Sequence, residues 1–255
     1  MEKYSTSWRS PLSPTLWPAN AFSLGRVALM VVAIASAGIG GLVLSIVIIR
    51  VTGIPLLGPH KSVQLNAGFT VLQTLTFLCA LAATLALLPR TARRSLAQLG
   101  LRVPRLADAG AAGIGTIAMF AAVQVAAYAQ KALFHIDGTQ QDIQIFGTSH
   151  DPRLIVSFII LAVCLAPIVE ETIFRGFLFN ALLRWTPPIL AIALTGLFFG
   201  AAHGDLVALF PLACGGAVLA TVYYRTGSLT ASMITHGLFN TVSVVLFLAG
   251  GGKNA

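Results

Sequence analysis

Charged side chains are scarce in this chain: they make up 9% of its 255 residues, and only eight of them are acidic. A soluble domain carries about 25% charged residues. With 56% apolar residues, the chain cannot cover its own surface with polar groups, so a freely soluble protein is excluded. Its apolar runs show no alternation typical of barrel strands, and we therefore predict an all-α, polytopic membrane helix bundle.

Cysteine is also rare, and its positions exclude a disulfide framework. Cys79, Cys164 and Cys214 all lie in apolar runs and match no metal-ligand spacing, so we interpret them as packing or lipid-facing residues. The net charge of +8 could suggest binding to nucleic acid. In a membrane protein it more often reflects cytoplasmic loops, and we expect no nucleic-acid partner.

The long apolar runs predict about seven transmembrane helices. We expect a polar cytoplasmic tail over residues 1–24 and a single membrane-embedded domain over 25–255. The first run, of about 23 residues, is longer than the core of a signal peptide, so we interpret it as a retained span. Pro167 predicts a kink in the fourth run. The runs cover residues 27–49, 64–88, 107–131, 153–183, 187–203, 207–224 and 228–249.

The distribution of basic residues predicts the orientation. The segment over residues 89–106 carries five arginines, and basic loops stay in the cytoplasm. With seven spans, this segment shares its side with the N-terminus, and that side holds ten basic residues against five on the other. We therefore predict a multi-pass protein of the cell membrane with its N-terminus in the cytoplasm and its C-terminus outside.

The few charged or strongly polar residues inside the last four spans are candidate functional residues, since a charge at the bilayer centre costs about 2.5–3.5 kcal/mol. Glu171 and Arg175 lie four residues apart on one helix face, which predicts an ion pair. Glu170 is left without its own cation, which suits a general base or a metal ligand. The candidates are Glu170, Glu171, Arg175, His203, His236 and Asn240.

The depth of these residues can be estimated from the turns between spans. Glu170 and His203 lie at similar distances from the turn at 185–188, so they can meet across an antiparallel pair of helices. His236 lies about 10 Å closer to its own turn, a mismatch that helix tilt, a broken fourth helix or a later start of the last span would absorb. A single histidine or asparagine in a membrane helix can simply bond to a neighbouring helix. The combination, however, is typical of a hydrolytic metal site, although no HExxH or CxxC motif is present.

Three segments of the second half resemble the signature motifs of a known family. "EETIFRG", "FFGAAH" and "TGSLTASMITHGLFN" match the patterns EExxxR, FxxxH and HxxxN in order and spacing. These are the motifs of the CPBP (ABI) intramembrane metalloprotease family, which includes type II CAAX prenyl endopeptidases and bacteriocin-immunity proteins. The resemblance covers a motif-bearing core of about residues 153–249, and the N-terminal spans carry no signal of the family.

The resemblance implies a role for each candidate. Glu170 activates water, and Glu171 and Arg175 hold Glu170 in place and tune it. His203 and His236 complete the site, and Asn240 stabilises the oxyanion or fixes the geometry. The implied fold is a helical bundle with a cavity open to the cytosol. A divalent metal, zinc in the first place, would be held by Glu170, His203 and His236. Which glutamate is the base and which a ligand is left open.

The resemblance thus implies a metal-dependent endopeptidase that cleaves a membrane-associated peptide or protein, lipidated or not, within the lipid bilayer. Two other functions fit the same residues. A non-catalytic immunity or scaffolding protein would use the bundle to bind a partner. A cation-coupled transporter would use Glu170 and the histidines as a relay, but such a transporter should show paired broken helices, and only Pro167 points to a break.

Overall fold

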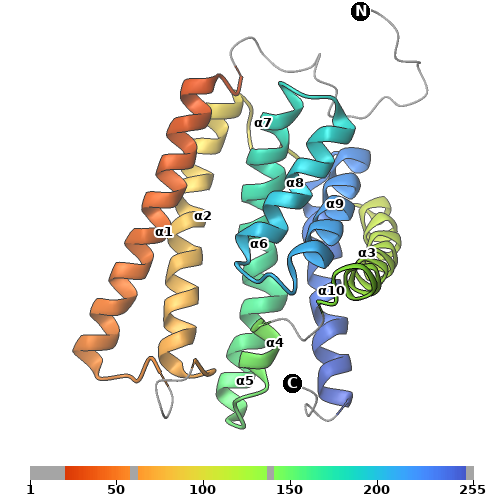
Figure 1. Ribbon diagram of the computed structural model, residues 1–255. Coiled ribbons are helices and arrows are strands. Elements are labelled where there is room, and N and C mark those ends of the chain that lie inside the picture. The colour runs from red at the N-terminus through yellow and green to blue at the C-terminus, as the bar shows by residue number, and fades with distance from the viewer. Residues whose placement is uncertain (1–20, 58–62, 137–140, 251–255) are drawn as a thin grey trace, which may run out of the picture.

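The computed structural model describes residues 21–57, 63–136 and 141–250, and all regular structure in that part of the chain is helical. Figure 1 shows the long helices side by side, with α1 and α2 as a pair on one side. The seven predicted runs agree with the observed helices to within four residues at each end. The single helices are α1 (Leu24–Thr52), α2 (Ala67–Ala92), α3 (Leu106–Phe134), α4 (Gln141–Phe146), α8 (Pro188–Ala202), α9 (Leu209–Thr226) and α10 (Leu229–Ala249).

The fourth predicted run is one continuous helical segment, Pro152–Leu183, in which α-helical and π-helical turns alternate. In chain order it consists of α5 (Pro152–Ile160), the π-helix η3 (Leu161–Leu165), α6 (Ala166–Glu171), the π-helix η4 (Thr172–Phe179) and α7 (Asn180–Leu183).

Local sequence signals define several helix ends. The Asn66 side chain accepts a hydrogen bond from Phe69 N at 2.8 Å and begins α2, and Ser228 caps α10 through Ala231 N at 3.1 Å. Gly227 follows α9 in the left-handed conformation (φ 60°), which glycine adopts without steric cost. Each of these signals involves only residues that are close together in the sequence, which is why the helix positions could be predicted.

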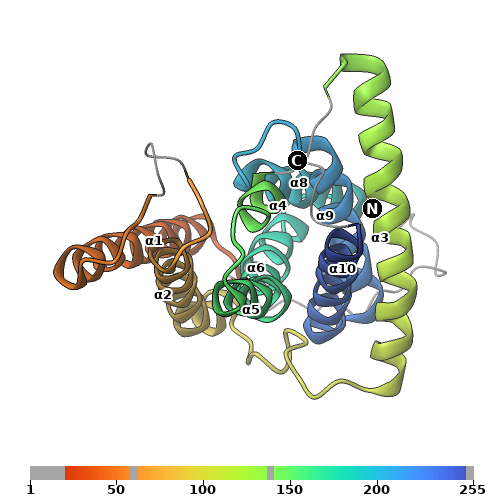
Figure 2. The same ribbon diagram turned by 90° about the horizontal axis from the view of Figure 1, so that it is seen from below.

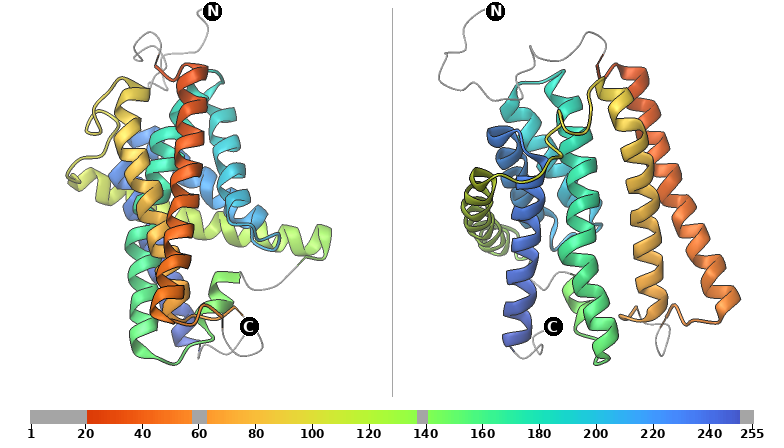
Figure 3. Two further views of the ribbon diagram at one scale, coloured as in Figure 1. Left: turned by 90° about the vertical axis from the view of Figure 1, so that its left-hand side faces the viewer. Right: turned by 180° about the vertical axis from the view of Figure 1, so that it is seen from behind.

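The all-α membrane bundle is confirmed, but a count of seven spans is not. In the part of the chain that the structure describes, five helical segments are long and apolar enough to cross a membrane: α1, α2, α3, the Pro152–Leu183 segment and α10. With 15 residues, α8 is about 22 Å long, shorter than the hydrocarbon core of about 30 Å. Figures 1 and 3 show that α8 and α9 form a hairpin whose connecting loop lies at mid-height of the bundle.

Helix α3 lies across the bundle rather than along it (Figures 2 and 3). It crosses α9 and α10, and Gly115 allows the close approach, because a Cβ there would meet the side chains of Val222 and Thr235. Further along α3, Gln130 Nε2 donates to Val207 O at 2.8 Å, in the loop between α8 and α9. Its length and composition suit a membrane span, but its direction differs from that of the other long helices.

The connections that were predicted to share one side lie together at one end. The start of α1, the segment before α3 and the turns after α7 and α9 are all at this end (Figure 1), and α10 ends at the opposite end. Leu229 N donates to Gly100 O at 3.0 Å, which joins two of these connections. Which end faces the cytoplasm stays a prediction, as does the single domain over 25–255. The predicted tail lies, up to residue 20, outside the described residues.

Candidate active site

Glu170 and Glu171 sit at the end of α6, between the two π-helices, and Arg175 lies within the second of them, η4. Pro167 has no backbone N–H, and the Ala166 N–H donates to Leu161 O, so the carbonyl of Ala162 has no donor within its own helix. The Asn240 side chain fills this place, because its Nδ2 donates to Ala162 O at 2.7 Å. Asn240 therefore ties α10 to the turn before Glu170, and the kink predicted at Pro167 takes the form of a π-helical turn.

The second π-helix is supported in the same way by an asparagine that the sequence reasoning missed. Asn180 Nδ2 donates to the carbonyls of Arg175 and Gly176 at 2.9 and 3.0 Å. It also lies 2.9 Å from the Tyr223 hydroxyl, which itself donates to Leu99 O. All of these side chains are buried, so the backbone around Arg175 is firmly held. A lone asparagine in a predicted membrane helix gave no signal of this role.

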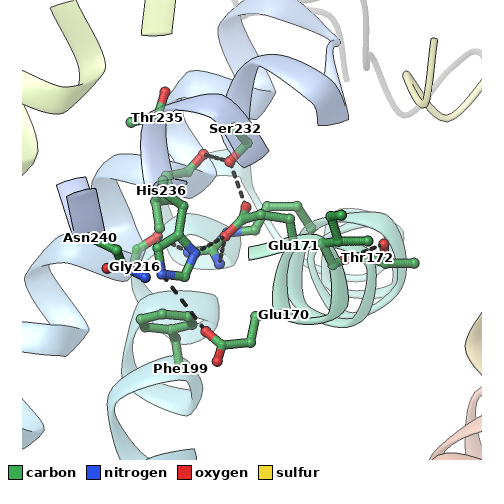
Figure 4. Close-up of polar contacts among 12 residues, drawn as sticks. Glu170, Glu171, Thr172, Phe199, Gly216, Ser232, Thr235, His236 and Asn240 are labelled. Carbon is green, nitrogen blue, oxygen red and sulfur yellow. Dashed lines mark hydrogen bonds and ion pairs between the residues drawn. The ribbon is translucent and has the colours of Figure 1, made fainter. Parts of the chain in front are cut away.

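The predicted ion pair is confirmed. Arg175 Nη1 lies 2.8 Å from Glu171 Oε1, and both side chains are fully buried. Arg175 Nη2 donates to Gly216 O at 2.7 Å, and the guanidinium carbon lies 4.8 Å from the centre of the Phe199 ring. Ser232 Oγ donates to the other carboxylate oxygen of Glu171 at 2.5 Å (Figure 4). Ser232 was missed by the sequence reasoning, although it lies one helical turn before His236.

His236 joins the two glutamates. Its Nδ1 is 3.1 Å from Glu171 Oε1, and its Nε2 is 3.9 Å from Glu170 Oε2 (Figure 4). Because the ionised carboxylate of Glu171 only accepts hydrogen bonds, we assign the proton to Nδ1, which leaves Nε2 directed toward Glu170. Of the three explanations for the depth mismatch, the later start applies: the turn before α10 lies lower in the bundle than the turn after α7 (Figure 1), and His236 contacts the glutamates of α6.

Glu170 is placed differently from Glu171. Its side chain is 16% exposed, and its Oε2 has no hydrogen-bond partner among the described residues. It faces a cavity of about 990 Å³ that is also lined by His203, His236 and Asn240. Four of the six predicted residues therefore line one cavity, while Glu171 and Arg175 lie behind its wall.

His203 enters the site from the loop between α8 and α9. It ends α8, its Nδ1 is 2.8 Å from Phe199 O, and its ring lies 4.8 Å from the Phe199 ring. The Phe199 ring is also 5.7 Å from the His236 ring, so it packs against both histidines and against the Arg175 guanidinium. Gly196 and Gly200 bring α8 close to the backbone of α9, which fixes the position of this loop.

The arrangement of the polar side chains bears on whether the site holds a metal ion. Among the described residues, no three His, Cys, Asp or Glu side chains lie close enough together to hold one metal. Catalytic zinc sites use three protein ligands. Glu170 and His236 form a close pair, but His203 does not complete a three-ligand set with them in this arrangement. Zinc held by Glu170, His203 and His236 therefore stays a prediction.

Fold and site together define a class: a helical membrane bundle with a buried Glu–Arg–His cluster behind a polar cavity wall. Residues 152–242 match the family model described as "Type II CAAX prenyl endopeptidase Rce1-like". This range contains all six predicted site residues, and the resemblance stated from the three motifs is confirmed over it.

Two curated relatives match shorter stretches. An uncharacterized protein of Mycoplasma capricolum subsp. capricolum is 35% identical over 98 residues, which is 37% of this chain and 28% of that protein. The "Putative membrane peptidase YdiL" of Bacillus subtilis is 33% identical over 90 residues, 35% of this chain and 37% of that protein. The matches thus span well under half of either relative. No solved structure matches the chain significantly.

Proposed function

We propose that this chain is an intramembrane endopeptidase that hydrolyses a peptide bond of a membrane-associated peptide or protein. The observation that carries the proposal is the placement of Glu170: it lines a large cavity, and its buried Oε2, which has no hydrogen-bond partner in the described chain, lies 3.9 Å from His236 Nε2. The matched family and the name of the Bacillus relative support a protease.

The reaction begins with a water molecule between Glu170 and His236. A separation of 3.9 Å is too long for a direct hydrogen bond, but one water can donate to both Oε2 and Nε2. Glu170 takes a proton as the water oxygen attacks the scissile carbonyl carbon. When the tetrahedral intermediate collapses, the carbon–nitrogen bond breaks and Glu170 returns the proton to the leaving amine.

Other residues hold this pair in place. Glu171, fixed by Arg175 and Ser232, keeps the Nδ1 proton of His236 on the far side of the ring. Asn240 Nδ2 uses one N–H for Ala162 O and keeps the second for the developing oxyanion, and loss of such a donor costs about 3 kcal/mol in other enzymes. A divalent metal, zinc by the sequence prediction, would polarise the carbonyl and acidify the water when bound.

The substitution Glu170→Gln tests the proposal, because it keeps the shape and removes the basicity. In detergent, with a peptide library as substrate, we expect near-total loss of cleavage, parent-like peptide binding and an equal or higher melting temperature. We expect His203→Ala and His236→Ala to abolish cleavage as well. If zinc is bound, both should also lower the zinc content measured by elemental analysis.

Two results would contradict the proposal. Cleavage that survives Glu170→Gln would remove Glu170 from the chemistry. A parent chain that cleaves no peptide, yet protects cells from a bacteriocin with or without Glu170, would identify a scaffold or immunity protein instead.

A further inference from the structure

The cavity has polar groups that the reaction does not use, and two of them lie on α2. The α2 residues that line it are Gln73, Thr76, Phe77 and Ala80, at positions i, i+3, i+4 and i+7, so they form one face of that helix. Helix α2 packs between α1 and the segment that carries Glu170 (Figure 2). This face of α2 and Glu170 therefore form walls of the same cavity.

Two threonines of the described helices, Thr76 and Thr195, have a buried hydroxyl without a hydrogen-bond partner, and of these two only Thr76 lines the cavity. Elsewhere in α2, Thr70 and Thr84 donate to the carbonyls four residues earlier, at 3.0 and 2.7 Å. Thr76 Oγ1 is buried and has no hydrogen-bond partner among the described residues. It shares this property with Glu170 Oε2, and both line the cavity. Burial of a hydroxyl without a partner costs about 1–3 kcal/mol, so the group needs a partner from outside the helix.

Gln73 is the second unused group. It lies one turn before Thr76 and is half-buried, and its side chain forms no hydrogen bond with another described residue. A primary amide has donors and an acceptor, and a hydroxyl has both as well. Together they complement the N–H and C=O of a peptide unit, which lose their own water partners when a substrate enters the membrane.

We propose that Gln73 and Thr76 form a peptide-backbone subsite, which hydrogen-bonds amide groups of the substrate on the α2 wall of the cavity. The inference rests on the proposed endopeptidase function and adds the substrate chemistry: an extended peptide segment lies along α2 and is recognised through its backbone. Both groups are uncharged, so the subsite selects for backbone amides and not for charged side chains.

The test uses the library peptide that the parent chain cleaves fastest. We expect Thr76→Val and Gln73→Leu each to raise KM about two- to tenfold, as for a lost neutral hydrogen bond, with kcat within about twofold of the parent. Thr74→Val is the matched control, since Thr74 lies on the same helix but does not line the cavity. It should leave KM unchanged. The melting temperature of Thr76→Val should equal or exceed that of the parent, because the lost hydroxyl had no partner.

A series of ester analogues of the same peptide locates the contact. An ester that removes the N–H facing α2 should weaken binding to the Glu170→Gln chain, and weaken it less when Thr76→Val or Gln73→Leu is also present. An unchanged KM in both α2 variants, with cleavage intact, overturns the subsite and leaves the proposed function standing. A parent chain that cleaves no library peptide overturns both.

Discussion

At the scale of single residues, the two adjacent glutamates have different surroundings. Both oxygens of Glu171 are occupied, Oε1 by Arg175 and His236 and Oε2 by Ser232. Glu170 keeps an oxygen without a hydrogen-bond partner in the described structure. A carboxylate that accepts several hydrogen bonds and an ion pair is a poor proton acceptor. The geometry therefore favours Glu170 as the base and Glu171 as the residue that positions His236, a choice that the sequence left open.

Ser232 provides a prediction at this scale. Ser232→Ala removes a buried donor to a carboxylate, so we expect a loss of about 1.5–3 kcal/mol in stability. Since Glu171 orients His236, kcat should fall about 10–100-fold, as for other residues that orient a functional side chain. Melting in detergent and peptide cleavage measure the two effects. The control is Ser45→Ala, a buried serine of α1 that donates only to Gly41 O, and a loss of activity there would contradict the explanation.

The ion pair gives a second residue-scale prediction. Arg175→Met leaves the Glu171 carboxylate buried without its cation, which should cost about 3–5 kcal/mol in the free energy of unfolding. Glu171→Gln combined with Arg175→Met should recover part of that loss, because no unpaired charge remains, but little activity. Thermal melting and cleavage of the four chains form a double-mutant cycle. Single variants that melt like the parent would show that the pairing contributes nothing.

At the scale of the secondary structure elements, the helices could be predicted and the π-helical turns could not. Apolar runs and caps lie within one stretch of sequence, and they placed the helices. The π-helical turn before Glu170 depends on Pro167 and on an amide from Asn240, 78 residues away from the carbonyl it binds. No local pattern encodes a hydrogen bond of that range. The same holds for the Ser232 contact to Glu171, which joins two different helices.

The link between Pro167 and Asn240 can be tested by coupling. Asn240→Ala leaves the Ala162 carbonyl without a donor, and we expect a loss of about 1–3 kcal/mol in stability. Pro167→Ala restores a backbone N–H to this turn, so Asn240→Ala should cost less in the Pro167→Ala background. A melting cycle of the four chains measures the difference. Additive effects of the two substitutions would refute the idea that Asn240 replaces the missing proline donor.

At the scale of the whole molecule, the composition and the three motifs predicted a helical membrane bundle and the residues that meet in it. They did not predict that the α8–α9 hairpin turns at mid-height or that α3 lies across the bundle (Figures 1 and 2). An apolar run of a given length fixes neither the direction of a helix nor the depth of its turns. The choice among the three explanations for the depth of His236 needed the structure for this reason, since the sequence does not show that the turn before α10 lies lower than the turn after α7 (Figure 1).

The orientation of the whole molecule leads to the last prediction. Residues 89–106, at the end of α2 and directly after it, carry five arginines, and this segment lies at the same end as the start of α1 and the turns after α7 and α9 (Figure 1). Such a basic end stays in the cytoplasm, so a reporter fused near Gln98 should give a cytoplasmic signal and one fused after Gly251 an extracytoplasmic signal. Exchange of Arg90, Arg93 and Arg94 for glutamine should weaken this bias, whereas Arg153→Gln at the opposite end should not. The reverse pair of signals in the parent chain would show that the molecule has the opposite orientation. Substrates would then have to reach Glu170 from the other side of the membrane.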